Sequence, residues 1–211
     1  MNKHRIILIV FVLLGTVASH AQFQFGVKAG MNNSKATLNG LYAQQLRVED
    51  FFGFQAGPII EYVTPSPGLR MGFDLAVLYS MEGFKLAGAT LENFETQAQS
   101  YQANSLLIPL NLKAKLLVKE WGLYVTAGPY ARFPLNRNLE QQYETQTFGC
   151  GLNGSVGLQL GRHFQIGLNY QLSLTDDYSK LKLLTVGDIP DYISEINGRA
   201  VDRTISITYF F

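Results

Sequence analysis

Cysteine and histidine are scarce in this chain, and each scarcity excludes a kind of chemistry. Cys150 is the only cysteine, so the chain forms no internal disulfide and takes its stability from another source. His163 is the only histidine beyond residue 21, and no His/Cys/carboxylate cluster has metal-ligand spacing. The sequence therefore predicts no metal, no cofactor and no enzyme that depends on a histidine general base beside a nucleophile.

A charge excess and a long hydrophobic run are also missing. The 17 basic and 16 acidic residues give a formal net charge of +1, whereas nucleic-acid-binding proteins normally carry a clustered basic excess. The one unbroken apolar run, residues 6–17, is too short for a comfortable membrane-spanning helix. We expect no nucleic-acid partner, and any membrane insertion has to use strands.

The first 21 residues have the three parts of a secretory signal peptide. Residues 2–5 are basic, residues 6–17 are apolar, and Ala18-Ser19-His20-Ala21 places small residues where signal peptidase cuts. This pattern predicts that residues 1–21 are cleaved and that residues 22–211 form a single exported domain.

From Gln22 onward, apolar and polar residues alternate with the period of a strand that has two unlike faces. Each alternating segment is long enough to cross a bilayer as a tilted strand, which takes roughly 9–11 residues. The predicted strands are 23–32, 51–63, 69–80, 105–118, 122–133, 148–160, 164–173 and 201–211.

The connections alternate between short and long. Short turns are expected at 64–68, 119–122 and 161–163, and long loops at 33–50, 82–104, 134–146 and 175–199. Tight periplasmic turns and extended outer loops are typical of bacterial outer-membrane barrels. The sequence therefore predicts an all-β fold, an eight-stranded antiparallel up-and-down transmembrane β-barrel with short periplasmic turns and long extracellular loops.

Glycine placement decides which face points outward. Glycines fall mainly on the polar face, which suits a cramped lumen, and the large apolar side chains are too many for a narrow barrel to enclose. Aromatic residues near the strand ends resemble the interfacial girdles of a membrane barrel. We expect the apolar face to contact lipid, the last strand to pair with the first, and bulges at Pro58, Pro109 and Pro129.

Several segments together resemble a known family. FQFGVKAGMNNS, FGFQAGPIIEY, FDLAVLYSMEGFKL, SLLIPLNLKAKL, GLYVTAGPYARF and RTISITYFF are similar, in order and spacing, to the PorT-like outer-membrane β-barrel family of Bacteroidota. The resemblance covers essentially the whole mature chain and implies an outer-membrane location. It also implies that Tyr209 and Phe211 form a C-terminal signal for the barrel-assembly machinery.

Charged residues on the polar face are the first candidate site. A plausible register places Glu61 beside Arg70, and Asp74 near Lys113. We favour a paired plug that fills the lumen, and the alternative is a polar conduit or small-ligand site. The predicted lumen network consists of Lys28, Glu61, Arg70, Asp74, Lys113, Lys115 and Arg132.

The last long loop is the second candidate site, because purely solvated loops are rarely so apolar. It either folds over the barrel mouth or offers a partner an apolar patch edged with acidic residues. Its candidate contact residues are Tyr178, Leu181, Leu183, Leu184, Ile189 and Tyr192.

These features favour a non-enzymatic structural or accessory protein in the outer membrane of a Gram-negative bacterium. Its expected partners are outer-membrane lipid, the assembly machinery during insertion, and other envelope proteins through the extracellular loops. The alternatives are a narrow transport or ligand-binding barrel and, with less support, an outer-membrane enzyme.

Overall fold

The computed structural model describes residues 23–39, 48–66, 68–86, 90–91, 94–95, 99–135, 144–145, 148–175, 178–179 and 197–211. The predicted signal peptide, residues 1–21, and most of the last long loop lie outside these ranges. Within the described ranges, no helix is long and apolar enough to cross a membrane.

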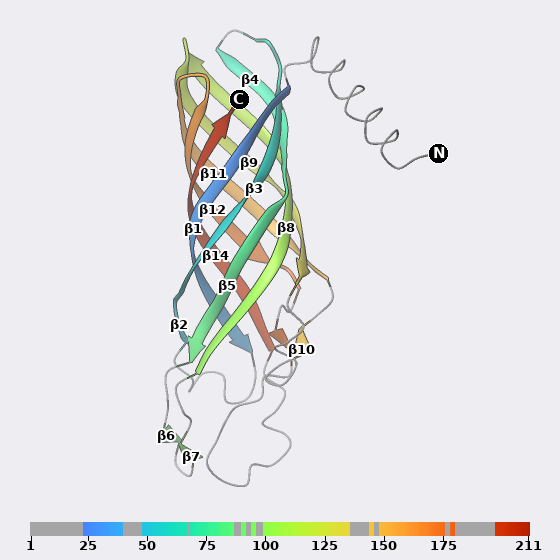
Figure 1. Cartoon of the computed structure of the whole chain (residues 1–211), viewed down its shortest axis with the longest axis vertical. Helices are drawn as coiled ribbons and strands as arrows, with labels where there is room; N and C mark the ends of the chain where they lie inside the picture. Colours follow the sequence, from blue (N-terminus) through green and yellow to red (C-terminus); the bar gives the residue numbers. More distant parts are fainter. Residues whose placement is uncertain are drawn as a thin grey trace, which may run out of the picture.

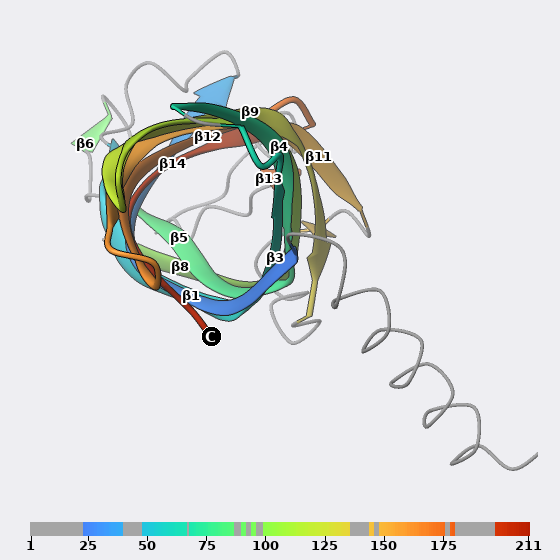
Figure 2. The same ribbon diagram turned by 90° about the horizontal axis from the view of Figure 1, so that it is seen from above.

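Eight barrel strands form one closed antiparallel sheet, seen end-on in Figure 2. Counting β4 (Leu69–Ala76) and its continuation β5 (Leu78–Leu86) as one, the barrel strands are β1 (Phe23–Asn39), β3 (Phe51–Val63), β4 with β5, β8 (Gln99–Val118), β9 (Trp121–Pro134), β11 (Gly149–Leu160), β12 (Phe164–Ser173) and β14 (Asn197–Phe210). Each barrel strand pairs with the next, and β1 pairs with β3 on one side and with β14 on the other. The predicted fold class is confirmed, and so is the pairing of the last strand with the first.

The two ends of the barrel differ. The C-terminus and the short turns lie at the upper end in Figure 1, which we call the turn end. The two-residue turn between β8 and β9 joins the cross-strand pair of Val118 and Trp121, and Lys119 adopts a positive φ of 61° there. Such a φ matches the primed turns that suit the twist of a hairpin.

The long connections lie at the opposite end, which we call the loop end. Five two-residue strands occur in or beside them: β2 (Val48–Glu49), β6 (Thr90–Leu91), β7 (Phe94–Glu95), β10 (Glu144–Thr145) and β13 (Tyr178–Ser179). The predicted starts of the loops at residues 33 and 82 are wrong. Pairing continues to Asn39 opposite Asn197 and to Leu86 opposite Gln99, because backbone hydrogen bonding needs no alternation of apolar side chains.

The bulges expected at the three strand prolines are absent from the described ladders. Between the pairs Ile59–Ala76 and Ala56–Tyr79, each strand contributes two residues, so Pro58 interrupts the ladder without shifting the register. A bulge would place an extra residue on one strand. The same constant register holds on both sides of Pro109 and Pro129.

The outward face is apolar and the inward face is polar, as predicted. In β12, exposed and buried residues alternate without a break: apolar Ile166 and Leu168 point outward, whereas Gln165 and Asn169 are buried. Aromatic pairs lie toward both ends. The ring centroids of Phe23 and Tyr62 are 5.0 Å apart near the turn end, and those of Phe133 and Phe148 are 5.4 Å apart near the loop end. These pairs resemble the two girdles of a membrane barrel.

Glycines on the inward face make room for tyrosine rings. A Cβ added at Gly157 would lie 2.5 Å from Cζ of Tyr124, and one at Gly151 would lie 2.5 Å from Cζ of Tyr130. Both tyrosines are buried in the lumen. Glycine is therefore required at these two positions by the close approach of a ring.

We expect Gly157→Ala to destabilise the barrel by about 1–3 kcal/mol, because its methyl group has to displace the ring of Tyr124 or the backbone of Ile166. Unfolding in urea, measured in detergent micelles by tryptophan fluorescence, reports the change. Gly154→Ala is the matched control: the nearest atom to its added Cβ is 3.5 Å away, so we expect a change below about 0.5 kcal/mol. Equal midpoints for the two variants would contradict this account of the glycines.

Candidate functional site

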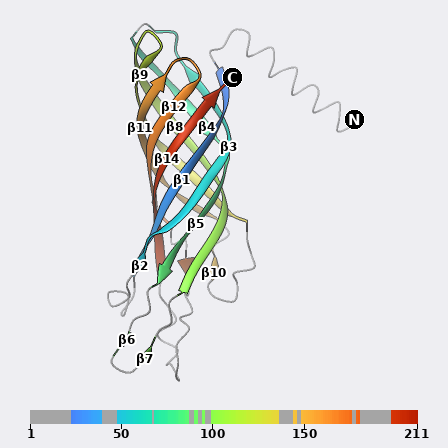
Figure 3. The same ribbon diagram turned by 60° about the vertical axis from the view of Figure 1, so that its left-hand side comes forward.

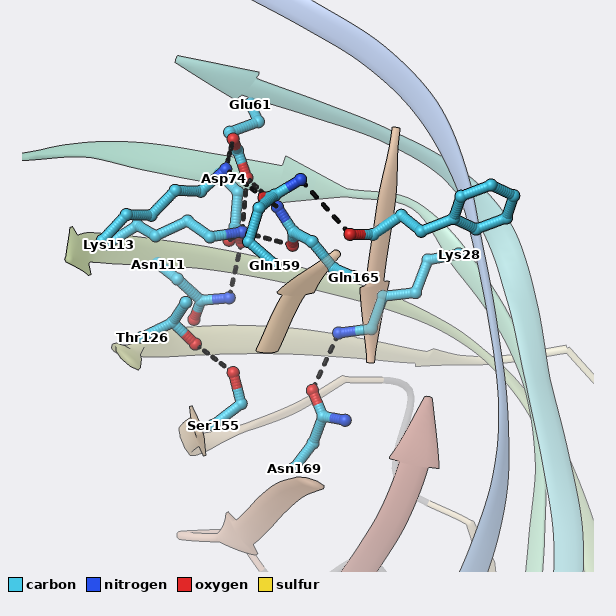
Figure 4. Close-up of polar contacts among 12 residues, drawn as sticks. Lys28, Glu61, Asp74, Asn111, Lys113, Thr126, Ser155, Gln159, Gln165 and Asn169 are labelled. Atoms are coloured by element: carbon cyan, nitrogen blue, oxygen red, sulfur yellow. Dashed lines mark hydrogen bonds and ion pairs between the residues drawn. The ribbon is translucent and has the colours of Figure 1, made fainter. Parts of the chain in front are cut away.

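The candidate site is the lumen, where polar side chains from all around the ring meet. Its densest part, which we call the turn-side cluster, lies toward the turn end. The cluster consists of Glu61, Asp74, Asn111, Lys113, Lys115, Gln159 and Gln165. Figure 4 shows how these side chains converge from several strands.

Strand alternation places the charges of this cluster. Asn111, Lys113 and Lys115 are two residues apart on β8, so all three point inward. Lys113 lies opposite Gly72 of β4, where an added Cβ would meet the backbone of Tyr62 and Val63 on β3. Asp74 lies opposite Asn111 on one side and opposite Glu61 on the other. The register therefore sets two carboxylates side by side, next to the lysines.

Glu61 is the centre of the cluster. Its side chain has no solvent exposure, and its carboxylate forms ion pairs with both Lys113 and Lys115. Lys113 also pairs with Asp74, with Nζ 3.2 Å from Oδ2, which confirms the expected proximity of these two residues. Each carboxylate in the cluster therefore contacts at least one ammonium group, as buried charges require.

Two glutamines that the sequence analysis did not select complete the cluster. Gln165 donates to Glu61 Oε2 at 3.1 Å and to Gln159 Oε1 at 2.8 Å. The same Gln159 oxygen accepts from Lys115 Nζ at 3.1 Å. Gln159 and Gln165 are cross-strand partners beside the turn at 161–163. Because the turn is short, the sequence already places both side chains on the same inward face, and this was the signal that could have identified them.

Aromatic rings lie against the lysines. The Nζ atom of Lys113 is 4.6 Å from the ring centroid of Tyr124, and that of Lys115 is 5.7 Å from the centroid of Phe210. The faces of these rings attract cations. Phe210 has no solvent exposure, so it fills the lumen while its neighbours Tyr209 and Phe211 point outward.

Arg70 lies outside the turn-side cluster, and its predicted contact with Glu61 is wrong. The β3–β4 register puts Glu61 opposite Asp74, whereas Arg70 lies nearer the turn, beside Lys115 on β8. The Arg70 Nε atom donates to the Ser66 carbonyl at 3.3 Å. The length of the turn sets this register, and alternation alone does not determine it.

Lys28 lies in the middle of the lumen. Its ammonium group donates to Asn169 Oδ1 at 2.8 Å, and Asn169 in turn donates to Ser206 Oγ at 2.8 Å. Nearby, the hydroxyls of Thr126 and Ser155 are 2.6 Å apart. The predicted inward position of Lys28 is confirmed, and the group that accepts its hydrogen bond is a neutral amide.

A second ionic group, which we call the loop-side cluster, surrounds Arg132. One of its Nη atoms lies 2.9 Å from Asp202 Oδ2 and 3.1 Å from Glu82 Oε2, and Ser105 donates to Glu82 at 2.7 Å. Arg132 was predicted, but its two carboxylate partners were not. Asp202 lies two residues before Thr204 on β14, so both side chains point inward. Glu82 lies on β5, in a segment for which the sequence predicts a loop.

The remaining predicted residues lie elsewhere. Tyr209 pairs with Val27, and the Phe211 amide donates to the Phe25 carbonyl at 2.9 Å, so both residues belong to the closing seam of the barrel. His163 is exposed in its turn, with Nδ1 2.7 Å from the Phe210 carbonyl oxygen. Tyr178 is described only as part of β13, and the other candidate loop residues, Leu181 to Tyr192, lie outside the described residues.

Among the described residues, the charges between the two rims of the lumen are balanced. Lys28, Lys113, Lys115 and Arg132 face inward, as do four carboxylates: Glu61, Asp74, Glu82 and Asp202. In the part of the chain that the structure describes, no group of three or more His, Cys, Asp or Glu side chains could hold a metal ion. The arrangement is that of a cross-linked polar core, as expected for a small barrel filled by its own side chains.

We expect Glu61→Gln to destabilise the barrel by about 3–5 kcal/mol, because it leaves the buried charges of Lys113 and Lys115 with less compensation. Urea unfolding in micelles measures the loss. Glu120→Gln makes the same chemical change in the exposed pair that Glu120 forms with Arg162. It should cost less than about 1 kcal/mol. If both variants unfolded at the wild-type midpoint, the turn-side cluster would not be a source of stability.

Comparison with known proteins finds a family and a set of similar barrels. Residues 17–178 match the family described as "Outer membrane protein beta-barrel domain". The outer membrane protein OprG of Pseudomonas aeruginosa is 13% identical with a TM-score of 0.49, over 91% of this chain and 97% of that one. Ail of Yersinia pestis, solved with the heparin analogue sucrose octasulfate, is 14% identical with a TM-score of 0.43, over 90% and 99%. No curated protein sequence matches significantly.

Proposed function

The chain belongs to the outer membrane protein beta-barrel domain family, and on this premise we propose that it is a non-enzymatic structural or accessory subunit of an envelope assembly. The observation that carries the proposal is the filled lumen. Two ionic clusters and the hydrogen-bonded residues between them occupy the space that a solute would need. A barrel plugged in this way acts through its rims and its outer surface.

The energetics support this proposal. Burying charged groups carries a desolvation penalty even when they are paired. Replacing them with apolar residues of similar volume often leaves the stability unchanged. Charged residues in the lumen instead make the packing specific, since a shift of β3 against β8 would separate Glu61 from Lys113 and Lys115. A rigid barrel of this kind is a suitable support for long loops that contact a partner.

The proposal includes the finer assignments that the sequence suggests. We assign the chain to the PorT-like barrels of Bacteroidota, on the ordered set of strand segments, and we place signal-peptide cleavage after Ala21. The loop at 175–199 is the proposed docking surface for another envelope protein. N-terminal sequencing of the protein isolated from outer membranes should begin at Gln22, and any other start would refute the assigned cleavage site.

We expect no stable single-channel currents when the purified protein is reconstituted into planar bilayers, because the side chains of both clusters block the lumen. A bacterial porin reconstituted in parallel shows that the bilayer detects pores. The double variant Arg132→Ser/Glu82→Ser removes one cation and one carboxylate together. It should still show no stable currents, because the turn-side cluster continues to block the lumen. Discrete wild-type conductance steps would refute the plugged barrel and favour transport.

Co-purification tests the accessory role. After gentle detergent extraction, the wild-type protein should retain other envelope proteins, whereas a variant that lacks residues 180–195 should lose them. A variant lacking residues 136–143, from another long connection at the same end, is the control and should retain them. If both deletions leave the associated proteins in place, the loop at 175–199 is not the docking surface.

A narrow ligand-binding barrel is the second candidate function, and a specific observation favours it. Both polar atoms of the Gln55 amide are buried without a hydrogen-bond partner among the described residues, as are Asn32 Oδ1 and Ser34 Oγ on the neighbouring strand. Buried polar groups in a finished core normally have partners. A small polar solute that raised the unfolding temperature of wild-type protein, but not of Gln55→Leu, would support this function.

A further inference from the structure

The mouth of the barrel at the turn end holds a pocket with a volume of about 750 Å³. The short connections and the C-terminus lie at this end, which is uppermost in Figure 3. Lys115 and Gln159 of the turn-side cluster line the pocket, so the filled lumen forms its floor. Small-molecule sites have volumes of roughly 300–1,000 Å³. The pocket is therefore large enough for a small ligand, which would reach it without passing through the lumen.

The wall of the pocket combines basic and apolar side chains. Arg70 lies near the start of β4, Lys119 in the turn between β8 and β9, and Arg162 in the turn between β11 and β12. Phe23 and Leu117 add apolar surface. A ligand that suits this wall has an anionic end and an uncharged organic part.

Two of the cations that line the pocket are engaged within the protein. The Arg162 Nε atom donates to Glu120 Oε1 at 2.6 Å, and this pair joins two neighbouring turns. Lys115 forms its ion pair with Glu61 at the floor. These two cations therefore contribute to the positive potential of the pocket, but their charges already have partners.

The other two cations that line the pocket have no such partner. In the part of the chain that the structure describes, neither Arg70 nor Lys119 forms an ion pair. The guanidinium of Arg70 donates through Nε to the Ser66 carbonyl at 3.3 Å, which is a neutral acceptor. Lys119 is exposed at the rim. Two positive charges are thus available to a ligand.

Positive charge remains at the turn end when every carboxylate is counted. The five cations on described residues of this end are Arg70, Lys113, Lys115, Lys119 and Arg162. The four carboxylates are those of Glu61, Asp74 and Glu120 and the α-carboxylate of Phe211. Residues 1–22, which precede β1, contain no Asp or Glu and cannot remove this excess.

We propose that this pocket binds a small soluble phosphate monoester. The phosphate group lies between Arg70 and Lys119, and the organic part lies against Phe23 and Leu117. A phosphate monoester carries roughly 1.5–2 negative charges at pH 7, which match the two available cations. Its oxygens are strong acceptors, and the planar guanidinium of arginine can donate to two of them at once.

The position of the pocket indicates where such a ligand comes from. Short turns of outer-membrane barrels face the periplasm, so the ligand is a solute of that compartment. The inference goes beyond the accessory role and does not depend on it, because the loop at 175–199 lies at the opposite end of the barrel.

Isothermal titration calorimetry on the whole mature protein, in micelles of an uncharged detergent, tests the inference. The probe is glycerol 3-phosphate, and the comparison ligands are glycerol, succinate and dioctanoyl phosphatidylglycerol. Wild-type protein should bind one glycerol 3-phosphate per chain more tightly than any comparison ligand. Arg70→Gln/Lys119→Gln should weaken this binding about tenfold or more, because it removes charged donors to the phosphate.

Lys35→Gln/Arg203→Gln is the matched control. It removes two exposed positive charges at the loop end and should leave the affinity for glycerol 3-phosphate unchanged. Both variants should keep the heat-modifiable migration on gels that reports a folded barrel. Wild-type affinity in Arg70→Gln/Lys119→Gln would overturn the inference, and so would an equal loss in the control. Succinate or dioctanoyl phosphatidylglycerol that bound as tightly as glycerol 3-phosphate would also overturn it, since the pocket would then select any dianion or a lipid headgroup.

Discussion

The structure depends on one constraint, the need of every backbone amide and carbonyl within a bilayer for a hydrogen-bond partner inside the protein. A sheet can meet that need only by closing, so β14 has to pair with β1. Closure on eight strands leaves a lumen too narrow for bulky apolar layers from every strand. The apolar residues therefore face lipid, and the charged and amide side chains are enclosed.

Enclosure of charge then requires internal compensation. The turn-side cluster meets this requirement by sharing Glu61 between two lysines, and the loop-side cluster by placing Arg132 between two carboxylates. Lys28 lies between the two clusters together with neutral amides and hydroxyls. The result is a core of polar contacts in place of the hydrophobic core of a soluble domain, surrounded by a hydrocarbon solvent.

The sequence was most informative where a physical period determines the structure. Alternation was sufficient to identify the eight strands, the outward apolar face and the inward position of Lys28 and Lys113, because a strand can place neighbouring side chains only on opposite faces. It was insufficient for Arg70, since cross-strand partners depend on turn geometry as well as on parity. The loop-end limits of the strands were predicted too early. Backbone pairing continues after Asn32 and at Glu82, where apolar and polar residues no longer alternate. The prolines were misjudged for a related reason: a lost hydrogen bond at Pro58 was accommodated without an extra residue.

The last strand has a consequence for the order of assembly. β14 carries Asp202, which pairs with Arg132, and Phe210, which lies against Lys115. β14 thus supplies a carboxylate to the loop-side cluster and an aromatic ring that lies against a lysine of the turn-side cluster. A barrel that joined its edges before this strand entered would enclose cations with fewer compensating groups, and such an intermediate is unfavourable. The charged interior therefore favours closure with β14 in place over closure without it.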